Sequence, residues 1–287
     1  MRTYREVFGR GKIAIGVVHL GPLPGSPRFR GDLEGVVATA VGEARTFARG
    51  GFDGLIVENY GDLPFMGEKV GPETVAAMSI AAAEVRKAVS IPVGINVLRN
   101  DTEAALAIAG VCGCEFVRVN VLVGAFATSE GLVEGRPGET ARLRMALAPE
   151  ALVLADALVK HAYPLAPRSL ADDALDVAER GGADAVIVTG PRTGKPPSAR
   201  DLEVVRASLS GAGLDVPILV GSGADPSNAE NFLRLSDGLI VGSYVRRHGK
   251  AGERIEPRKV MEMGKIKRRF AGRGARGKSS PGGRSGA

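Results

Sequence analysis

The sequence has few residues that form disulfides or bind transition metals, with two cysteines and three histidines among 287 residues. Cys112 and Cys114 are too few for a disulfide framework, and their spacing is a poor geometry for a single bridge. We therefore expect a reducing, cytoplasmic environment, with both cysteines packed in the interior. No cluster of metal ligands and no dinucleotide-binding glycine fingerprint is evident, so we predict no metal and no other cofactor.

Long apolar segments are also missing. No stretch near the N-terminus has the long apolar core of a signal peptide, and no apolar run reaches the length needed to span a bilayer. This pattern again favours a cytoplasmic protein.

An excess of positive charge is absent from most of the chain, although the net formal charge is +6. Eight of the 38 basic residues lie from Lys265 onward, with no acidic residue among them, so the rest of the chain is close to neutral at about −2. We predict one folded domain over residues 1–271 and a disordered Gly/Ser/Arg tail over 272–287. The tail could contact anionic lipid or nucleic acid weakly, or have no partner. A lipid contact would place the protein at the periphery of a membrane. We expect no specific nucleic-acid recognition.

Eight short apolar runs alternate with helical patterns along the chain. Such alternation indicates a parallel sheet with helices outside it, and eight units predict a (β/α)8 TIM barrel. Asp32 is placed to cap the first of these helices, which should end at Gly50-Gly51. The predicted strands are 13–20, 54–60, 92–98, 116–121, 152–158, 185–189, 217–221 and 237–242.

An internal repeat supports closure of the barrel. Residues 49–57 match residues 180–188 at an offset of four predicted strand–helix units, and weaker echoes precede the fourth and eighth strands at Glu115 and Asp237. Duplication of a half-barrel would give this pattern, although short turns can also converge on it.

The last two predicted strands both end in glycine and serine. In this fold the loops after strands seven and eight often hold a phosphate, and glycine lets backbone N–H groups approach an anion closely. Residues 225–227 should then open a helix, with Pro226 or Ser227 in its first turn. We predict phosphate binding by Gly221, Ser222, Gly223, Gly242 and Ser243.

Polar residues at the carboxyl ends of the other strands are the candidate catalytic groups. His19 could act as a general acid or base, or could only hydrogen-bond a loop. Glu58 and Asp156 could form an acid/base pair, or could hold Arg118 and Lys160 in ion pairs. Lys160 could form a Schiff base if desolvated, but its place at or beyond the strand end favours contact with a phosphate or carboxylate.

Further polar residues at the same ends suit substrate recognition. Amide side chains such as Asn59, Asn96 and Asn120 can bind the hydroxyl groups of a sugar. Residues 192–195 form a cationic loop that could close over an anionic ligand or remain solvated. The predicted substrate-binding residues are Asn59, Asn96, Arg118, Asn120 and Thr189.

Two long motifs give the chain a family resemblance. Two segments, 16–27 and 53–65, closely resemble signatures of the BtpA family, which includes SgcQ-type proteins. The first segment reads Gly-Val-Val-His-Leu-Gly-Pro-Leu-Pro-Gly-Ser-Pro. Shorter matches surround Arg118, Asp156 and Thr189, and the resemblance covers roughly residues 10–270. Gly21 is a departure, since many members carry a larger apolar residue there.

The resemblance implies a ribulose-phosphate-binding type of barrel and two classes of function. The family is named for biogenesis of photosystem I, which implies a membrane-associated assembly factor, although other members occur in organisms without photosynthesis. SgcQ-type members resemble enzymes of sugars or nucleosides. Beside the glycine turns, this favours an enzyme acting on a small phosphorylated ligand by isomerase, lyase or glycosidase chemistry. A metabolite-sensing barrel remains an alternative, and a homo-oligomer is compatible with the sequence.

Overall fold

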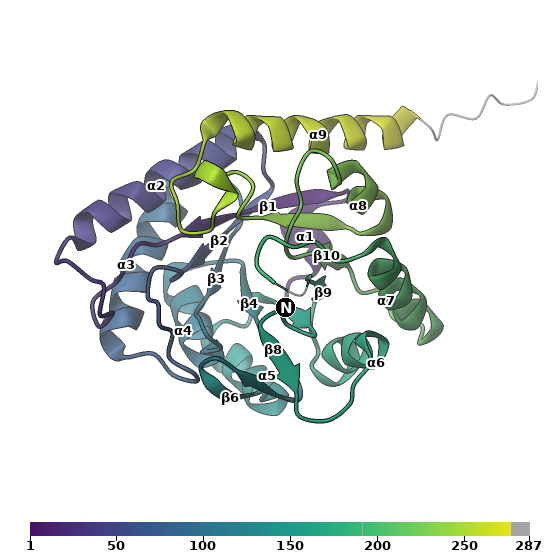
Figure 1. Cartoon of the computed structure of the whole chain (residues 1–287), viewed down its shortest axis with the longest axis horizontal. Helices are drawn as coiled ribbons and strands as arrows, with labels where there is room; N and C mark the ends of the chain where they lie inside the picture. Colours follow the sequence, from purple (N-terminus) through teal and green to yellow (C-terminus); the bar gives the residue numbers. More distant parts are fainter. Residues whose placement is uncertain (191, 277–287) are drawn as a thin grey trace, which may run out of the picture.

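Eight parallel strands close into a barrel in the order β1-β11-β10-β9-β7-β4-β3-β2, as the sequence predicts. The computed structural model describes residues 1–190 and 192–276. Figure 1 shows the strands surrounded by helices. The barrel strands are β1 (Ile13–His19), β2 (Gly54–Glu58), β3 (Val93–Asn96), β4 (Phe116–Val119), β7 (Leu152–Ala157), β9 (Ala185–Val188), β10 (Ile218–Val220) and β11 (Gly238–Val241).

The outer helices alternate with the barrel strands, as the sequence pattern predicts. At the start of α2 (Leu33–Gly50) the Asp32 carboxylate accepts the Gly35 N–H at 2.8 Å, and Gly51 ends the helix in the left-handed region at φ 84°. Both predicted ends of this helix are confirmed. The others are α3 (Pro72–Ala88), α4 (Thr102–Cys112), α5 (Pro137–Leu147), α6 (Leu170–Leu175) with a π-helical turn (Asp176–Arg180), α7 (Ala199–Gly211), α8 (Ala229–Leu235) and α9 (Pro257–Arg276).

The prediction for the helix after the seventh barrel strand is wrong in its start. α8 begins at Ala229, and Pro226 and Ser227 lie in a turn before it. The Asp225 carboxylate accepts the Ser227 N–H at 2.8 Å, so this acidic side chain stabilises the turn and caps no helix.

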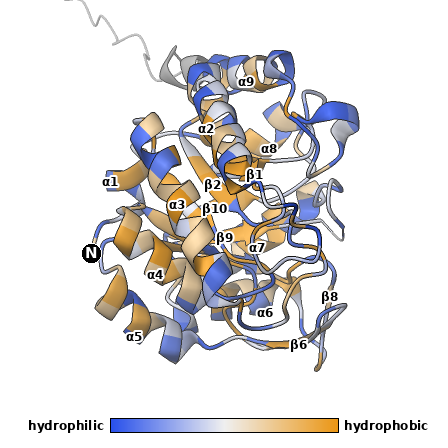
Figure 2. Cartoon of the chain, turned by 90° about the vertical axis from the view of Figure 1, so that its left-hand side faces the viewer, coloured by the Kyte–Doolittle hydropathy of each residue, from blue (hydrophilic) through white to orange (hydrophobic). Residues whose placement is uncertain are grey.

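The barrel interior is filled by apolar side chains and closed at its amino-terminal end. Short helix α1 (Tyr4–Phe8) packs Tyr4 on Phe8, with ring centroids 5.0 Å apart, and Phe8 on Phe116 at 5.3 Å. Hydrophobic residues follow the central strands in Figure 2. Apolar side chains fill this end of the barrel. The polar groups that could form a site lie at the carboxyl ends of the strands, as is usual in this fold. The interior core also contains Ile13, Ile15, Val17, Ile56, Leu152, Leu154, Ile187, Leu219 and Ile240.

The internal repeat marks a contact that recurs four times around the barrel. An acidic residue just before every second barrel strand accepts a backbone N–H from the first or second residue of the preceding barrel strand, at 2.7–2.9 Å. Each acid also pairs with a basic side chain, so its charge is balanced as it fixes the register of two neighbouring strands. The acid and base pairs are Asp53 with Lys267, Glu115 with Arg86, Asp184 with Arg144, and Asp237 with Arg206.

A small antiparallel sheet beside the barrel mouth has no counterpart in the sequence prediction. It has the order β6-β5-β8, and combines the hairpin β5 (Ala125–Thr128) and β6 (Gly131–Glu134) with β8 (Ala162–Pro164). It therefore joins the loop after β4 to the loop after β7. A 3₁₀ turn (Arg247–Gly249) follows β11.

At the C-terminal end, α9 continues to Arg276 and so passes the predicted domain boundary after residue 271. Residues 277–287, which make up most of the predicted tail, lie outside the described part of the chain. In Figure 1, α9 lies along the top of the barrel beside α2 and α8.

Candidate functional site

A cavity of about 240 Å³ opens at the carboxyl ends of the barrel strands. It brings together ten of the fourteen residues that the sequence predicts for the site. Those ten are His19, Glu58, Arg118, Asn120, Lys160, Gly221, Ser222, Gly223, Gly242 and Ser243. The other four, Asn59, Asn96, Asp156 and Thr189, do not line it.

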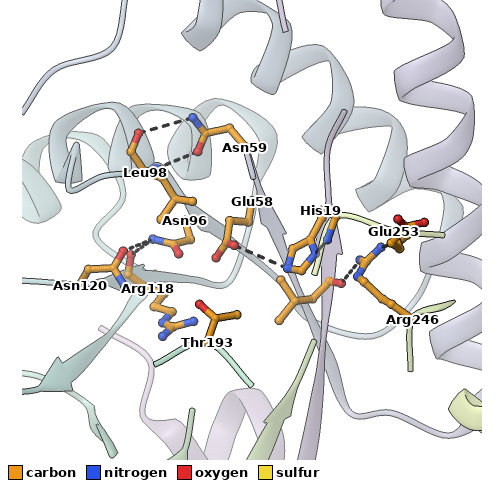
Figure 3. Close-up of polar contacts among 12 residues, drawn as sticks. His19, Glu58, Asn59, Asn96, Leu98, Arg118, Asn120, Thr193, Arg246 and Glu253 are labelled. Atoms are coloured by element: carbon orange, nitrogen blue, oxygen red, sulfur yellow. Dashed lines mark hydrogen bonds and ion pairs between the residues drawn. The ribbon is translucent and has the colours of Figure 1, made fainter. Parts of the chain in front are cut away.

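His19 and Glu58 form a buried pair at the ends of neighbouring strands β1 and β2. Figure 3 shows the imidazole pointing toward the carboxylate, and Nε2 lies 3.6 Å from Oε1. The Gly252 N–H donates to His19 Nδ1 at 3.1 Å, so Nδ1 carries no proton and neutral His19 carries its proton on Nε2. The ring of Tyr60 stacks on the imidazole with centroids 4.5 Å apart. The pair is thereby held in one orientation.

The surroundings shift both groups of this pair toward their neutral forms. Burial, together with the cations of Arg246 and Lys160, lowers the pKa of His19 well below its ordinary value. Burial raises the pKa of Glu58, and Arg118 opposes that rise. The surroundings thus favour His19 as a neutral hydrogen-bond donor beside a carboxyl group whose raised pKa makes its anion a stronger base, an arrangement suited to proton transfer.

Lys160 contributes an amine to the same cavity. Burial and the neighbouring Arg118 cation lower its pKa to about 8. The Arg99 guanidinium donates to the Lys160 carbonyl at 2.6 Å and so fixes the backbone of this segment.

Below the cavity, Arg118 joins a hydrogen-bonded polar layer. Its Nε and Nη2 donate to the two carboxylate oxygens of Asp156 at 3.0 and 2.9 Å, and Asn120 Nδ2 donates to Asp156 at 3.1 Å. Asn96 Nδ2 donates in turn to Asn120 Oδ1 at 3.1 Å (Figure 3). Asp156 and Asn96 therefore hold Arg118 and Asn120 in place beneath the cavity.

Asn59 is hydrogen-bonded to neighbouring protein groups, and Thr189 is buried without a hydrogen-bond partner in the described part of the chain. Asn59 Oδ1 accepts the Leu98 N–H at 2.7 Å, and its Nδ2 donates to Asp62 at 3.1 Å. Figure 3 shows the bond from the Leu98 N–H together with a second contact, from Asn59 Nδ2 to the Leu98 carbonyl. The hydroxyl of Thr189 is buried and has no hydrogen-bond partner within residues 1–190 and 192–276. A substrate contact by either residue stays a prediction.

The glycine turns after β10 and β11 form one wall of the cavity. A Cβ atom at Gly221 would lie 2.4 Å from Ile187 Cγ2, so only glycine fits there. Gly223 has φ +70°, which glycine adopts without strain. Gly242 has more room, since a Cβ there would meet Val17 Cγ2 at 3.6 Å and His19 Cε1 at 3.7 Å. The glycine wall and the His19 ring are therefore in direct proximity.

The loop after β9 rests against this wall. Gly194 N–H donates to Ser222 Oγ at 3.1 Å, and the Thr193 N–H donates to His161 Nε2 at 3.1 Å. Thr193 and His161 both line the cavity. This contact closes one side of the mouth, although the predicted lid movement stays a prediction.

Three contacts at the site had no role in the sequence prediction. Arg99 lies 3.7 Å from Glu130, which reaches the cavity from the turn between β5 and β6. Arg246 is 1% exposed, pairs with Glu43 at 3.0 Å and donates to the Val17 carbonyl at 2.7 Å. Arg99 stands at a predicted strand end, which is a usable signal, whereas no local pattern marks Glu130 or Arg246.

The described residues contain neither a cluster of metal ligands nor a membrane-spanning helix. Across residues 1–190 and 192–276, no group of three or more His, Cys, Asp or Glu is placed to hold a metal ion. Within the same residues, no helix combines the length and the apolar character needed to cross a membrane.

Comparison with known proteins decides the family. The BtpA family model matches residues 10–268. This chain belongs to the BtpA family. It is 46% identical over 255 residues to the Photosystem I biogenesis protein BtpA of Synechocystis, covering 89% of this chain and 88% of the relative. An uncharacterized protein of Pyrococcus horikoshii is 45% identical over 255 residues, covering 89% and 95%.

Solved structures support the fold of this BtpA-family chain. Phosphoribosyl anthranilate isomerase from Thermus thermophilus superposes with a TM-score of 0.53 at 14% identity, covering 88% of this chain and 97% of the isomerase. At such low identity the likeness extends to the barrel fold alone.

Proposed function

We propose that this barrel binds a small phosphorylated metabolite at the glycine turns and transforms it by acid/base chemistry between His19 and Glu58. The observation that carries the proposal is the proximity of the two features. A Cβ at Gly242 would lie 3.7 Å from both Cε1 and Nε2 of His19. A phosphate held at the turns therefore presents the rest of a small ligand to the buried pair.

The charges around the cavity suit an anionic ligand. Arg118 and Lys160 line the cavity, and the Gly221 position lies close to Arg118, since a Cβ there would be 3.7 Å from Nη2. The Gly221 N–H is already bonded to the Val188 carbonyl at 2.9 Å, so Ser222, Gly223, Gly242 and Ser243 are the candidate backbone donors.

The orientation of the pair supports a division of roles. The Glu58 carboxylate, with its raised pKa, would remove a proton from the ligand. The Nε2–H of neutral His19 would donate a hydrogen bond to the oxygen on which negative charge develops. An isomerase or lyase reaction fits these roles best. The isomerase that shares the barrel fold has a name that refers to a phosphoribosyl group. This supports a phosphorylated ligand only by analogy of fold.

Calorimetric binding of a panel of phosphate esters tests the proposal, with Gly242→Asp and Gly242→Asn as matched variants. Position 242 has room for a Cβ, and the two side chains differ by one charge. Repulsion between the Asp carboxylate and a phosphate is worth about 2–4 kcal/mol, so we expect binding to weaken by roughly 30-fold or more in Gly242→Asp. Gly242→Asn should stay close to wild type. Equal affinities in the three proteins, or no binding of any ester to wild type, would refute the proposal.

A second function is favoured by one observation, the 46% identity to a relative named as a photosystem I biogenesis protein. An assembly factor without catalysis would need the surface of the barrel and not the buried pair. The test is to replace the Synechocystis relative by this chain carrying His19→Gln and Glu58→Gln. Restored photosystem I accumulation by both the wild-type and the substituted chain would favour assembly without catalysis, and restoration by wild type alone would favour the enzyme.

A further inference from the structure

Lys160 differs from most described lysines in having an amine without a partner. Its side chain lines the cavity, and no hydrogen bond or ion pair of its Nζ is found within residues 1–190 and 192–276. By contrast, Lys12, Lys69, Lys259 and Lys267 all pair with carboxylates. An amine without a carboxylate partner is free to react with a ligand.

The backbone around Lys160 aims and holds this side chain. Leu158 and His161 on either side have positive φ values of 45° and 58°, a conformation rare for residues other than glycine. The Arg99 guanidinium fixes the Lys160 carbonyl, and the Leu158 N–H donates to Asp173 Oδ2 at 2.7 Å. Side chains held in such strained turns are frequent at functional sites.

The surroundings of Lys160 leave part of the amine unprotonated. Burial and the Arg118 cation lower its pKa to about 8, so about one molecule in ten has the neutral amine at pH 7. A neutral amine is the nucleophilic form.

We propose that Lys160 forms an imine with the carbonyl group of a phosphorylated ketone or aldehyde whose phosphate lies at the glycine turns. This inference rests on the proposed function and names its substrate class. Lys160 lines the same cavity as Gly223 and Gly242, so one small ligand can reach both the amine and the turns. Forming an imine also makes the adjacent C–H bond more acidic, and the Glu58 carboxylate could then remove that proton.

The step balances without any external oxidant or reductant. The Nζ lone pair attacks the carbonyl carbon, the C–N bond forms as the C=O π bond breaks, and one of the two nitrogen protons passes to the oxygen to give a carbinolamine. The Glu58 carboxylate, which lines the same cavity, then takes the second nitrogen proton and gives it to the hydroxyl group, which leaves as water. The raised pKa of Glu58 suits it to both accept and release this proton.

Borohydride trapping tests the imine. The probes are dihydroxyacetone phosphate, glyceraldehyde 3-phosphate and ribulose 5-phosphate, each compared with its unphosphorylated counterpart, and the adduct is located by peptide mass spectrometry. We expect Lys160 to be the main labelled lysine, with at least ~10-fold more adduct from the phosphorylated probes. Labelling should increase with pH around a midpoint near 8. Lys160→Arg keeps the cation, cannot form the imine, and should lose the adduct.

Phosphate binding measured in parallel separates the two proposals. If the esters raise the melting temperature of wild type and of Lys160→Arg but label no Lys160, the imine is refuted and the proposed function stands. If neither inorganic phosphate nor any ester stabilises wild type and Lys160 is unlabelled, both fall. Equal labelling of Lys160 and the exposed Lys87 would also overturn the inference.

Discussion

The ion pair beneath the cavity gives the sharpest stability prediction. The side chains of Arg118 and Asp156 are 4% and 0% exposed, and Arg118 donates two hydrogen bonds to the carboxylate. Arg118→Met keeps a long side chain of similar reach but leaves a buried carboxylate with Asn120 as its remaining donor. Removing one member of such a pair costs about 3–5 kcal/mol.

Equilibrium urea unfolding measures this loss. For a chain of 287 residues, about 3–5 kcal/mol corresponds to a melting temperature about 5–8 °C lower in a separate thermal scan. The control is Arg180→Met, which breaks an exposed ion pair between Arg180 and Asp176, with side chains 79% and 36% exposed, and should cost at most about 1 kcal/mol.

A double variant separates an unpaired charge from simple loss of packing. Arg118→Met with Asp156→Val removes both charges, so we expect it to be more stable than Arg118→Met alone. The reasoning is refuted if Arg118→Met costs no more than Arg180→Met, or if the double variant is the less stable one.

The remaining predictions concern other parts of the same site. Arg246→Met leaves Glu43 buried and unpaired, and urea unfolding should show a loss of about 3–5 kcal/mol. Asn59→Ala removes the hydrogen bonds to the Leu98 backbone and should cost about 1–3 kcal/mol in the same assay, with phosphate affinity unchanged in calorimetry. Because the pKa of Glu58 is raised, the folded state holds this proton more tightly than the unfolded state, so the contribution of Glu58 to stability falls as pH rises above its ordinary pKa of 4.5. Glu58→Gln should therefore gain stability relative to wild type as pH increases, and a flat difference across a pH series would contradict this.

Much of the barrel can be predicted from the sequence because its signals are local. Short apolar runs, several of which end at or just before glycine, mark the strands, and Asp32 and Gly51 mark the ends of α2. The repeated acid before alternate strands, seen at Asp53 and Asp184, has a physical cause in its hydrogen bond to the neighbouring strand.

Contacts between distant segments could not be predicted in this way. Glu130 reaches the cavity only because β5 and β6 fold back over the mouth, and Arg246 meets Glu43 across about two hundred residues of sequence. The sequence also could not tell a strand-end residue that lines the cavity from one that supports it. Asp156 and Glu58 are both acidic residues near the carboxyl end of an apolar strand. Asp156 is nevertheless hydrogen-bonded to Arg118 and Asn120, whereas Glu58 lines the cavity.

The central claim is that the glycine turns hold the anionic end of a ligand beside His19. The most direct measurement is a crystal structure of the protein soaked with tungstate, a tetrahedral oxyanion visible by its anomalous signal. We expect the anion at the turns, with oxygens about 2.7–3.2 Å from backbone nitrogens of residues such as Gly223 or Ser243. Tungstate bound to surface arginines with none at the turns would contradict the account.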